Sequence, residues 1–333
     1  MRSMKVFALI SISVILIACN RDTGYVEITG ETMGSTYVIK LEGEKGLKPR
    51  IDSLLSEFSQ LFSTYDENAF LYKFNHNTLT DADLQHLTER QCKWMTDIFK
   101  TSLVIYHKTE RAFNPALGPL FRFWGFGDNS KNPDDIDSLV IDSMLRYCNY
   151  ENFSFKGCFP QKPNANSELN FNAIAAGYAT DVIALFFDSL GIENYLINIT
   201  GELKAKGFNP SGELWQISIE KPADNKEMNA GMFTMELNNK AMATSGNYRN
   251  FFKIDGKKYG HTIDPTTGYP THNNLLSATV ISKSGATCDG LATAFMVMGF
   301  EDAKRMILSD SSLDGVLIYE SNGEMKIWIS WEQ

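Results

Sequence analysis

The stretch AIAAGYATDVIALFFDSLG, residues 173–191, decides the fold class of this chain. Its apolar side chains recur at helical spacing, and Gly191 stands where a C-terminal glycine is expected, so the stretch predicts a strong helix. The pattern then changes to short β-type runs between turns, at residues 195–199, 215–219, 232–237, 240–244 and 275–281. Consecutive strands with short turns favour an antiparallel sheet with helices packed on one side, which is an α+β fold.

Further elements are predicted on both sides of this stretch. An apolar stripe predicts a helix over residues 48–62, and residues 81–110 read as one long helix capped by Asp81. Prolines and glycines in residues 114–127 predict a short helix or turn. The chain should close with helices over 286–298 and 301–308 and a hairpin around Asn322-Gly323.

Composition limits the class of protein and its partners. With 333 residues, 43% of them hydrophobic, the chain can bury a substantial core, as one large domain or two closely packed halves. The formal charge is −9, and removal of Arg2 and Lys5 with an N-terminal leader would make it −11. An acidic body without basic runs argues against nucleic acid as a partner.

The first nineteen residues predict export. Arg2 and Lys5 precede a short apolar run, which ends in Leu-Ile-Ala-Cys19. This order is typical of a secretory signal, and the run is too short to span a bilayer comfortably. The final tetrapeptide resembles a bacterial lipobox, so we expect a lipid on Cys19 and a membrane lipoprotein that faces the periplasm. The expected division is a signal peptide at 1–18, a lipid-anchored linker at 19–27 and a single domain at 28–333.

Four cysteines follow Cys19, and their spacing matches no metal motif. Cys148 and Cys158 could pair in an oxidising compartment. Isolated buried thiols at all four positions are the favoured interpretation. The four are Cys92, Cys148, Cys158 and Cys288.

Three segments could carry chemistry. Asp289 and Thr293 lie four apart on a predicted helix, so a carboxylate and a hydroxyl that suit Mg²⁺ share one face. A capping or solvent-facing pair is the alternative. Residues 170–181 open the strong helix, where free N–H groups favour phosphate, although tight helix packing would need the same small residues. His261 could contact a ligand, or its turn could be purely structural.

The order and wording of these segments together resemble the ApbE family, the FAD:protein FMN transferases, over roughly residues 28–330. Many members of that family are lipoproteins, in agreement with Cys19. The matching pieces are Glu31-Thr-Met-Gly-Ser-Thr, Phe62-Ser-Thr-Tyr65, Phe74-Asn75, Phe113-Asn-Pro-Ala-Leu-Gly-Pro-Leu, Trp124-Gly-Phe-Gly, Ala173-Ile-Ala-Ala-Gly-Tyr-Ala-Thr-Asp181, Asn198-Ile-Thr-Gly-Glu202, Thr244-Ser-Gly-Asn-Tyr248, His261-Thr-Ile-Asp-Pro-Thr-Thr-Gly-Tyr-Pro270 and Asp289-Gly-Leu-Ala-Thr293.

The resemblance implies a T-fold-like α+β domain that uses FAD as substrate and Mg²⁺ as cofactor. It implies transfer of FMN to a threonine hydroxyl of an acceptor protein, typically a membrane electron-transfer subunit, with release of AMP. The metal would lie between the Ala173 carbonyl and the side chains of Asp289 and Thr293, with Ala292 beside it. The FAD contacts would be Met33, Tyr65, Ala112, Phe113, Asn114, Asn170, Ala176 and Ile263, with His261 close by.

The chain departs from the usual family pattern at four positions. Asn114 and Asn170 stand where aspartate is usual, Ala176 where lysine or another long polar residue is usual, and Thr200 where glycine is usual. Asparagine can hydrogen-bond but brings no negative charge. Two alternatives to the transferase stay open. Water as the acceptor in the same site would make the protein an FAD pyrophosphatase that yields FMN and AMP, and the four departures leave open a flavin-binding lipoprotein with little catalytic activity.

Overall fold

The computed structural model describes residues 24–43, 45–125, 136–219, 233–246, 251–254, 257–260 and 262–332. The predicted signal peptide, Cys19 and His261 lie outside these ranges. None of the helices in the described ranges is both long and apolar enough to cross a bilayer.

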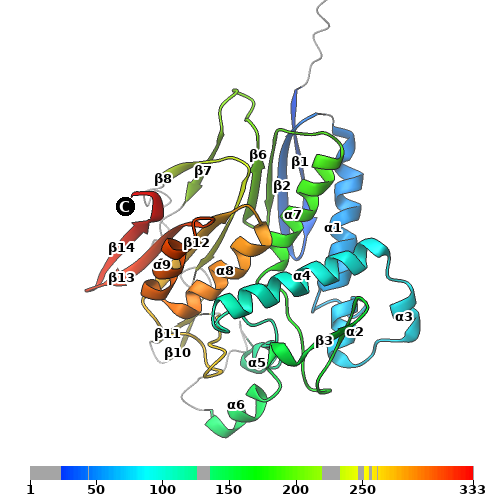
Figure 1. Cartoon of the computed structure of the whole chain (residues 1–333), viewed down its shortest axis with the longest axis vertical. Coiled ribbons are helices and arrows are strands. Elements are labelled where there is room, and N and C mark those ends of the chain that lie inside the picture. The colour runs from blue at the N-terminus through cyan, green and yellow to red at the C-terminus, as the bar shows by residue number, and fades with distance from the viewer. Residues whose placement is uncertain are drawn as a thin grey trace, which may run out of the picture.

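An eight-stranded antiparallel sheet forms the centre of the molecule (Figure 1). Its strand order is β1-β2-β5-β6-β9-β12-β13-β14, so neighbours in the sequence are mostly neighbours in the sheet. The strands are β1 (Tyr25–Thr32), β2 (Ser35–Glu42), β5 (Tyr195–Ile199), β6 (Glu202–Lys206), β9 (Lys240–Gly246), β12 (Leu275–Ser282), β13 (Asp314–Ser321) and β14 (Glu324–Ile329). The α+β prediction is confirmed.

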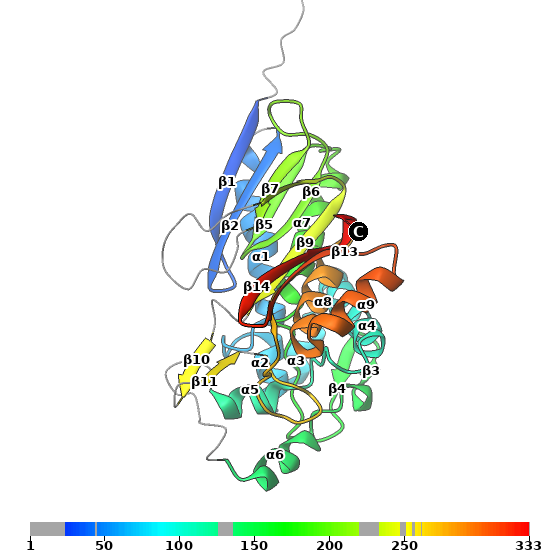
Figure 2. The same cartoon turned by 90° about the vertical axis from the view of Figure 1, so that its left-hand side faces the viewer.

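Helices cover one face of this sheet (Figure 2). Those that pack there are α1 (Lys48–Phe62), α7 (Ala175–Ser189), α8 (Gly285–Met298) and α9 (Phe300–Ser309), and α4 (Glu89–Lys108) packs against α1 and α8. Their apolar faces and the facing side chains of the sheet make one large core. The hairpin of β7 (Trp215–Ile219) and β8 (Phe233–Leu237) buries a smaller cluster against the opposite face.

Smaller elements pack beyond one end of the sheet (Figure 2). They are α2 (Phe70–His76), α3 (Asp81–Gln85), α5 (Gly118–Trp124), α6 (Ser138–Leu145), β3 (Ser154–Lys156), β4 (Phe159–Gln161), β10 (Phe251–Ile254) and β11 (Lys257–Gly260). The Trp124 indole N–H donates to the Gly268 carbonyl at 2.8 Å, which ties α5 to the loop after β11. This hydrogen bond holds the motif that begins at Trp124 beside the motif that contains Gly268.

The single helix expected over residues 81–110 is two helices, α3 and α4. Thr80, not Asp81, caps the first, and Thr88 caps the second. In each case the threonine side chain accepts the N–H three residues on, and the side chain at that position accepts the N–H of the threonine. Two such capping boxes only eight residues apart start two helices, because each satisfies the free donors of a new helix start.

The prediction of four isolated thiols is wrong for two of them. Cys92, near the start of α4, forms a disulfide with Cys158, in the turn between β3 and β4, with their Cα atoms 5.1 Å apart. Cys148 therefore does not pair with Cys158; it and Cys288 are free and buried, as expected. The bridged positions are 66 residues apart, so only the tertiary packing brings them together.

Candidate functional site

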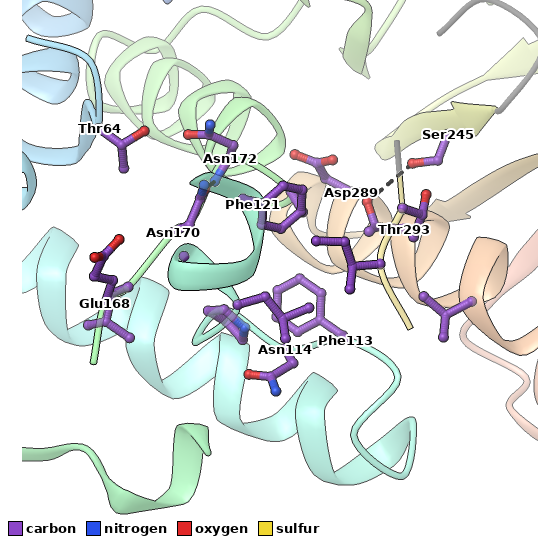
Figure 3. A pocket seen from close by; sticks show the side chains of 18 of the residues that line it. Thr64, Phe113, Asn114, Phe121, Glu168, Asn170, Asn172, Ser245, Asp289 and Thr293 are labelled. Atoms are coloured by element: carbon purple, nitrogen blue, oxygen red, sulfur yellow. Dashed lines mark hydrogen bonds between the residues drawn. The ribbon is translucent and has the colours of Figure 1, made fainter. Parts of the chain in front are cut away.

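An open pocket of about 780 Å³ lies where α5, the start of α7, the end of β9 and the middle of α8 meet (Figure 3). Most of the predicted site residues line it: Tyr65, Ala112, Phe113, Asn114, Asn170, Ala173, Ile263, Asp289 and Thr293. Residues that are far apart in the sequence therefore converge on one cavity of the size that small-molecule ligands occupy.

Asp289 is a buried carboxylate in the wall of this pocket. It is 6% exposed, and the Gly177 N–H donates to its Oδ2 at 2.9 Å. Burial raises the pKa of Asp289 well above its ordinary value, the negative charge of Glu202 raises it further, and the Gly177 N–H opposes both effects. No lysine or arginine pairs with Asp289 among the described residues. A cation at this position would hold the carboxylate in its charged form.

The hydrogen bond from Gly177 leaves the Ala173 carbonyl free. In a regular helix the Gly177 N–H would donate to the carbonyl four residues earlier, which is that of Ala173. Here it donates to Asp289 instead, while Tyr178 N–H donates to Ile174 in the regular way. Within the described ranges nothing donates to the Ala173 carbonyl, and Ala173 lines the pocket.

Thr293 supplies a third oxygen on the same side of α8. It lies one helical turn after Asp289, as its spacing predicts, and both line the pocket. Its Oγ1 is 3.3 Å from Oγ of Ser245, at the end of β9 (Figure 3). The neighbouring Thr244 hydroxyl is 2.9 Å from that of Thr279, so the end of β9 is fixed to the sheet.

This set of donors fits a hard divalent cation. It combines one carboxylate, one hydroxyl and one backbone carbonyl, all oxygen atoms, and the described residues contain no cluster of three His, Cys, Asp or Glu side chains suited to a metal. Mg²⁺ is commonly held by one or two carboxylates and completes its coordination with water and substrate phosphates. The open pocket beside Asp289 leaves room for both.

Asn114 and Asn170 also line the pocket, and the side chain of each is held by hydrogen bonds within the protein. Asn114 Nδ2 donates to the Cys148 carbonyl at 2.8 Å, and its Oδ1 accepts the Ala116 N–H at 2.9 Å. Asn170 Oδ1 accepts the Asn172 N–H at 2.9 Å, but no donated bond of its Nδ2 occurs among the described residues. The two positions at which the chain departs from the family pattern therefore differ. The amide of Asn114 donates to another residue of the protein, whereas the amide of Asn170 donates to none of the described residues.

Two predicted contacts, Met33 and Ala176, are not among the described residues that line the pocket, and a third, His261, is not described. Met33 is in the β1–β2 turn with φ at +50° and packs against the main core. Ala176 is half-buried in the first turn of α7. His261 lies outside the described residues, although the adjacent Thr262 and Ile263 line the pocket. The roles assigned to these three residues stay predictions.

A charged pair that the sequence does not predict lies in the lining of the pocket. Glu168 is 6% exposed and forms an ion pair with Arg122 from α5. Burial raises the pKa of Glu168, and the positive charges of Arg122 and Lys162 oppose that rise. A Cβ on Gly118 would lie 2.7 Å from the Cβ of Glu168, so glycine is required there. Nothing in the chain near Glu168 marks it, because its partner is 46 residues away.

Glu202 belongs to the family-like motif Asn198-Ile-Thr-Gly-Glu202, for which the sequence predicts no role. It begins β6 and accepts a hydrogen bond from the Thr200 hydroxyl at 2.7 Å. Thr200 has φ at +56°, a left-handed conformation that is rare for a β-branched residue and easy for the glycine usual in the family. The departure at Thr200 thus adds a hydrogen bond to the carboxylate whose charge acts on Asp289.

Comparison with known proteins agrees with this geometry. The model of the ApbE family matches residues 33–317. An FAD:protein FMN transferase of Vibrio cholerae is 36% identical over 297 residues, which cover 86% of this chain and 85% of that protein. One of Escherichia coli is 31% identical over 342 residues, covering 97% and 94%. The apo crystal structure of the Pseudomonas stutzeri flavinyl transferase ApbE superimposes with a TM-score of 0.78 at 29% identity, covering 92% and 94%. The chain belongs to the ApbE family.

Proposed function

We propose that this chain is an FAD:protein FMN transferase that requires Mg²⁺ and modifies a threonine of an acceptor protein. Its similarity to transferases of that name extends over nearly the whole chain. The observation that carries the metal-dependent part is that Ala173, whose carbonyl accepts no hydrogen bond from the described residues, lines the same pocket as Asp289 and Thr293.

These three oxygen donors would hold the metal. Mg²⁺, when bound, supplies positive charge that neutralises the phosphate oxygens of FAD and helps to align the pyrophosphate. The protein contributes the position of the ligands, because Gly177 orients Asp289 and Ser245 contacts Thr293. The charge of Glu202 near Asp289 makes a cation there still more favourable.

The rest of the pocket suits the two ring systems of FAD. Phe113, Phe121 and Ile263 contribute apolar surface to its lining. Tyr65 stands at the mouth with 81% of its surface exposed, and its hydroxyl accepts a hydrogen bond from Asn172 at 3.3 Å. An exposed aromatic ring at the rim can stack on a flat heterocycle, which would cover ring surface and exclude water.

In the transfer, the threonine oxygen of the acceptor attacks the phosphorus of the FMN half of FAD. The bond from that phosphorus to the bridging oxygen breaks, AMP leaves with the bridging oxygen, and the hydroxyl proton goes to solvent or to a base. The product is a phosphoester between FMN and threonine. If water attacked instead, the same bond would break and the products would be free FMN and AMP.

The location and the partner complete the proposal. Residues 1–18 would direct export and Cys19 would carry a lipid anchor, so that the domain from residue 28 faces the periplasm beside the membrane. A membrane electron-transfer subunit with a target threonine is the acceptor expected there. The absence of basic runs in this acidic chain supports a protein partner over nucleic acid.

The proposal is tested by the release of AMP from FAD, in the presence of a threonine-bearing acceptor, by the wild type and two variants of the exported body. The wild type should form AMP only with Mg²⁺, and Asp289→Ala should form none, because it lacks the only carboxylate among the proposed ligands. Asp188→Asn is the control, since it removes an ion pair on α7 that does not reach the pocket. Binding of FAD by the wild type without AMP formation would favour the flavin-binding lipoprotein, and AMP formation by Asp289→Ala would overturn the metal assignment.

A further inference from the structure

Asp181 on α7 caps the start of a different helix, α8. Its Oδ1 accepts the Gly285 N–H at 2.9 Å, and its Oδ2 accepts the Ala286 N–H at 3.1 Å. The Ser284 hydroxyl also donates to Oδ2, at 3.0 Å. Three donors at the first turn of α8 are therefore satisfied by one carboxylate from a neighbouring helix, where the helix dipole also favours negative charge.

Lys204 ties this carboxylate to the sheet. Its ammonium group, on β6, donates to Asp181 Oδ1 and, at 3.0 Å, to the Lys283 carbonyl just before α8. The side chains of Asp181 and Lys204 are only 14% and 18% exposed, so water screens this ion pair weakly. The carboxylate thus joins α7, β6 and the start of α8.

The helices are in direct backbone contact one turn away from Asp181. A Cβ on Gly177 would lie 2.2 Å from the Gly285 carbonyl oxygen, and one on Gly285 would lie 2.3 Å from the Gly177 carbonyl oxygen. The Thr180 hydroxyl donates to the same Gly177 carbonyl at 2.7 Å. The bonds at Asp181 therefore connect the two helices close to the point where their backbones are in contact.

We infer that Asp181 is a positioning residue for the metal site, an inference that rests on the proposed function. Asp289 and Thr293 follow Gly285 by one and two turns of α8, and Ala173 lies four residues before Gly177, just outside the start of α7. The register of the two helices therefore sets the distance between the Ala173 carbonyl and the two side chains. Asp181 fixes that register without touching the pocket.

Asp181→Asn is the sharpest perturbation. The amide has one acceptor oxygen in place of two, so it cannot accept all three donors of α8 and also pair with Lys204. Removal of partners that orient metal ligands typically weakens metal binding 10–100-fold. We expect Asp181→Asn to weaken the binding of Mn²⁺, used as a probe for Mg²⁺, by roughly that factor, with FAD binding in the absence of metal unchanged.

The experiment measures Mn²⁺ affinity by electron paramagnetic resonance, with the fold of each variant checked by near-UV circular dichroism. Wild type and Asp289→Ala test the metal site itself: no Mn²⁺ binding by the wild type would overturn the proposed site. Asp188→Asn is the matched control: Asp188 is on the same helix as Asp181, the substitution removes its 3.1 Å pair with Lys206 of β6, and the variant should bind Mn²⁺ as the wild type does.

Wild-type Mn²⁺ affinity in a folded Asp181→Asn protein would overturn the inference while the metal site stands. If Asp181→Asn does not fold, the inference is tested with Lys204→Met. This substitution removes the ion pair between β6 and Asp181 but leaves the hydrogen bonds from the start of α8 to Asp181 intact. We expect Lys204→Met to weaken Mn²⁺ binding several-fold. Unchanged affinity in that variant would equally overturn the inference.

Discussion

Replacing Asn114 by aspartate, the residue usual in the family, should damage this protein. Asn114 Nδ2 donates to the Cys148 carbonyl at 2.8 Å, while its Oδ1 accepts the Ala116 N–H. Aspartate keeps the second bond but has no donor for the first at neutral pH. Its second oxygen would instead face the carbonyl oxygen of Cys148, a residue only 5% exposed.

The expected loss in free energy of unfolding follows from the hydrogen bond to Cys148 that aspartate cannot make. A typical hydrogen bond contributes about 1 kcal/mol net, and a buried acceptor left without a donor costs roughly 1–3 kcal/mol more. We therefore expect Asn114→Asp to lower the free energy of unfolding by roughly 2–4 kcal/mol at pH 7. Asn170→Asp is the matched control. It keeps the acceptor for the Asn172 N–H and loses no donated bond in the described structure, so it should change stability by less than about 0.5 kcal/mol.

Urea unfolding at pH 7 and near pH 4 measures both effects. The carbonyl favours the protonated form of the new carboxyl, so its pKa is higher in the folded than in the unfolded chain. A group with a raised folded pKa stabilises below its unfolded pKa and loses that contribution as pH rises, so the deficit of Asn114→Asp should shrink near pH 4. Equal stabilities of the two variants at pH 7 would refute this account of Asn114.

Three further outcomes are expected. Cys19→Ala should abolish partition of the exported protein with membranes, and firm membrane binding of that variant in a fractionation experiment would disprove the lipid anchor. Replacing Cys92 and Cys158 together by serine should lower the free energy of unfolding by roughly 2–4 kcal/mol in denaturant titrations, since their bridge closes a long loop; an unchanged midpoint would contradict this. Burial lowers the pKa of Lys162 to about 8. The unfolded chain then binds more protons between about pH 8 and 10, stability from this group rises with pH there, and Lys162→Met should flatten that part of the stability curve.

Periodicity predicted α1, α7, α8 and α9 and much of the sheet, but not the division of residues 81–110 into α3 and α4. The stretch 173–191 contains α7, and β5 and β7 have the predicted bounds. The hairpin of β1 and β2 was not predicted as such, because Gly30 interrupts its pattern. The structure explains that glycine: Gly30 is opposite Tyr37, and a Cβ there would lie 2.5 Å from the tyrosine ring.

Of the proposed metal ligands, the residue pattern alone predicts only those that are side chains. The spacing of Asp289 and Thr293 was sufficient to place both on one face of a helix. The availability of the Ala173 carbonyl came from the family resemblance, since it depends on where the Gly177 N–H donates. The roles of Asp181 and Glu168 depend on partners that only the folded chain brings close, so no local pattern reveals them.

Transfer itself is tested most directly by the mass of the acceptor. The exported body is incubated with FAD, Mg²⁺ and a threonine-bearing acceptor, and both intact acceptor mass and AMP are measured. We expect an acceptor heavier by one FMN group on threonine, with one AMP formed per modified acceptor, and neither product with Asp289→Ala. Release of AMP and free FMN with an unmodified acceptor would show a pyrophosphatase instead, and tight FAD binding without AMP would contradict catalysis altogether.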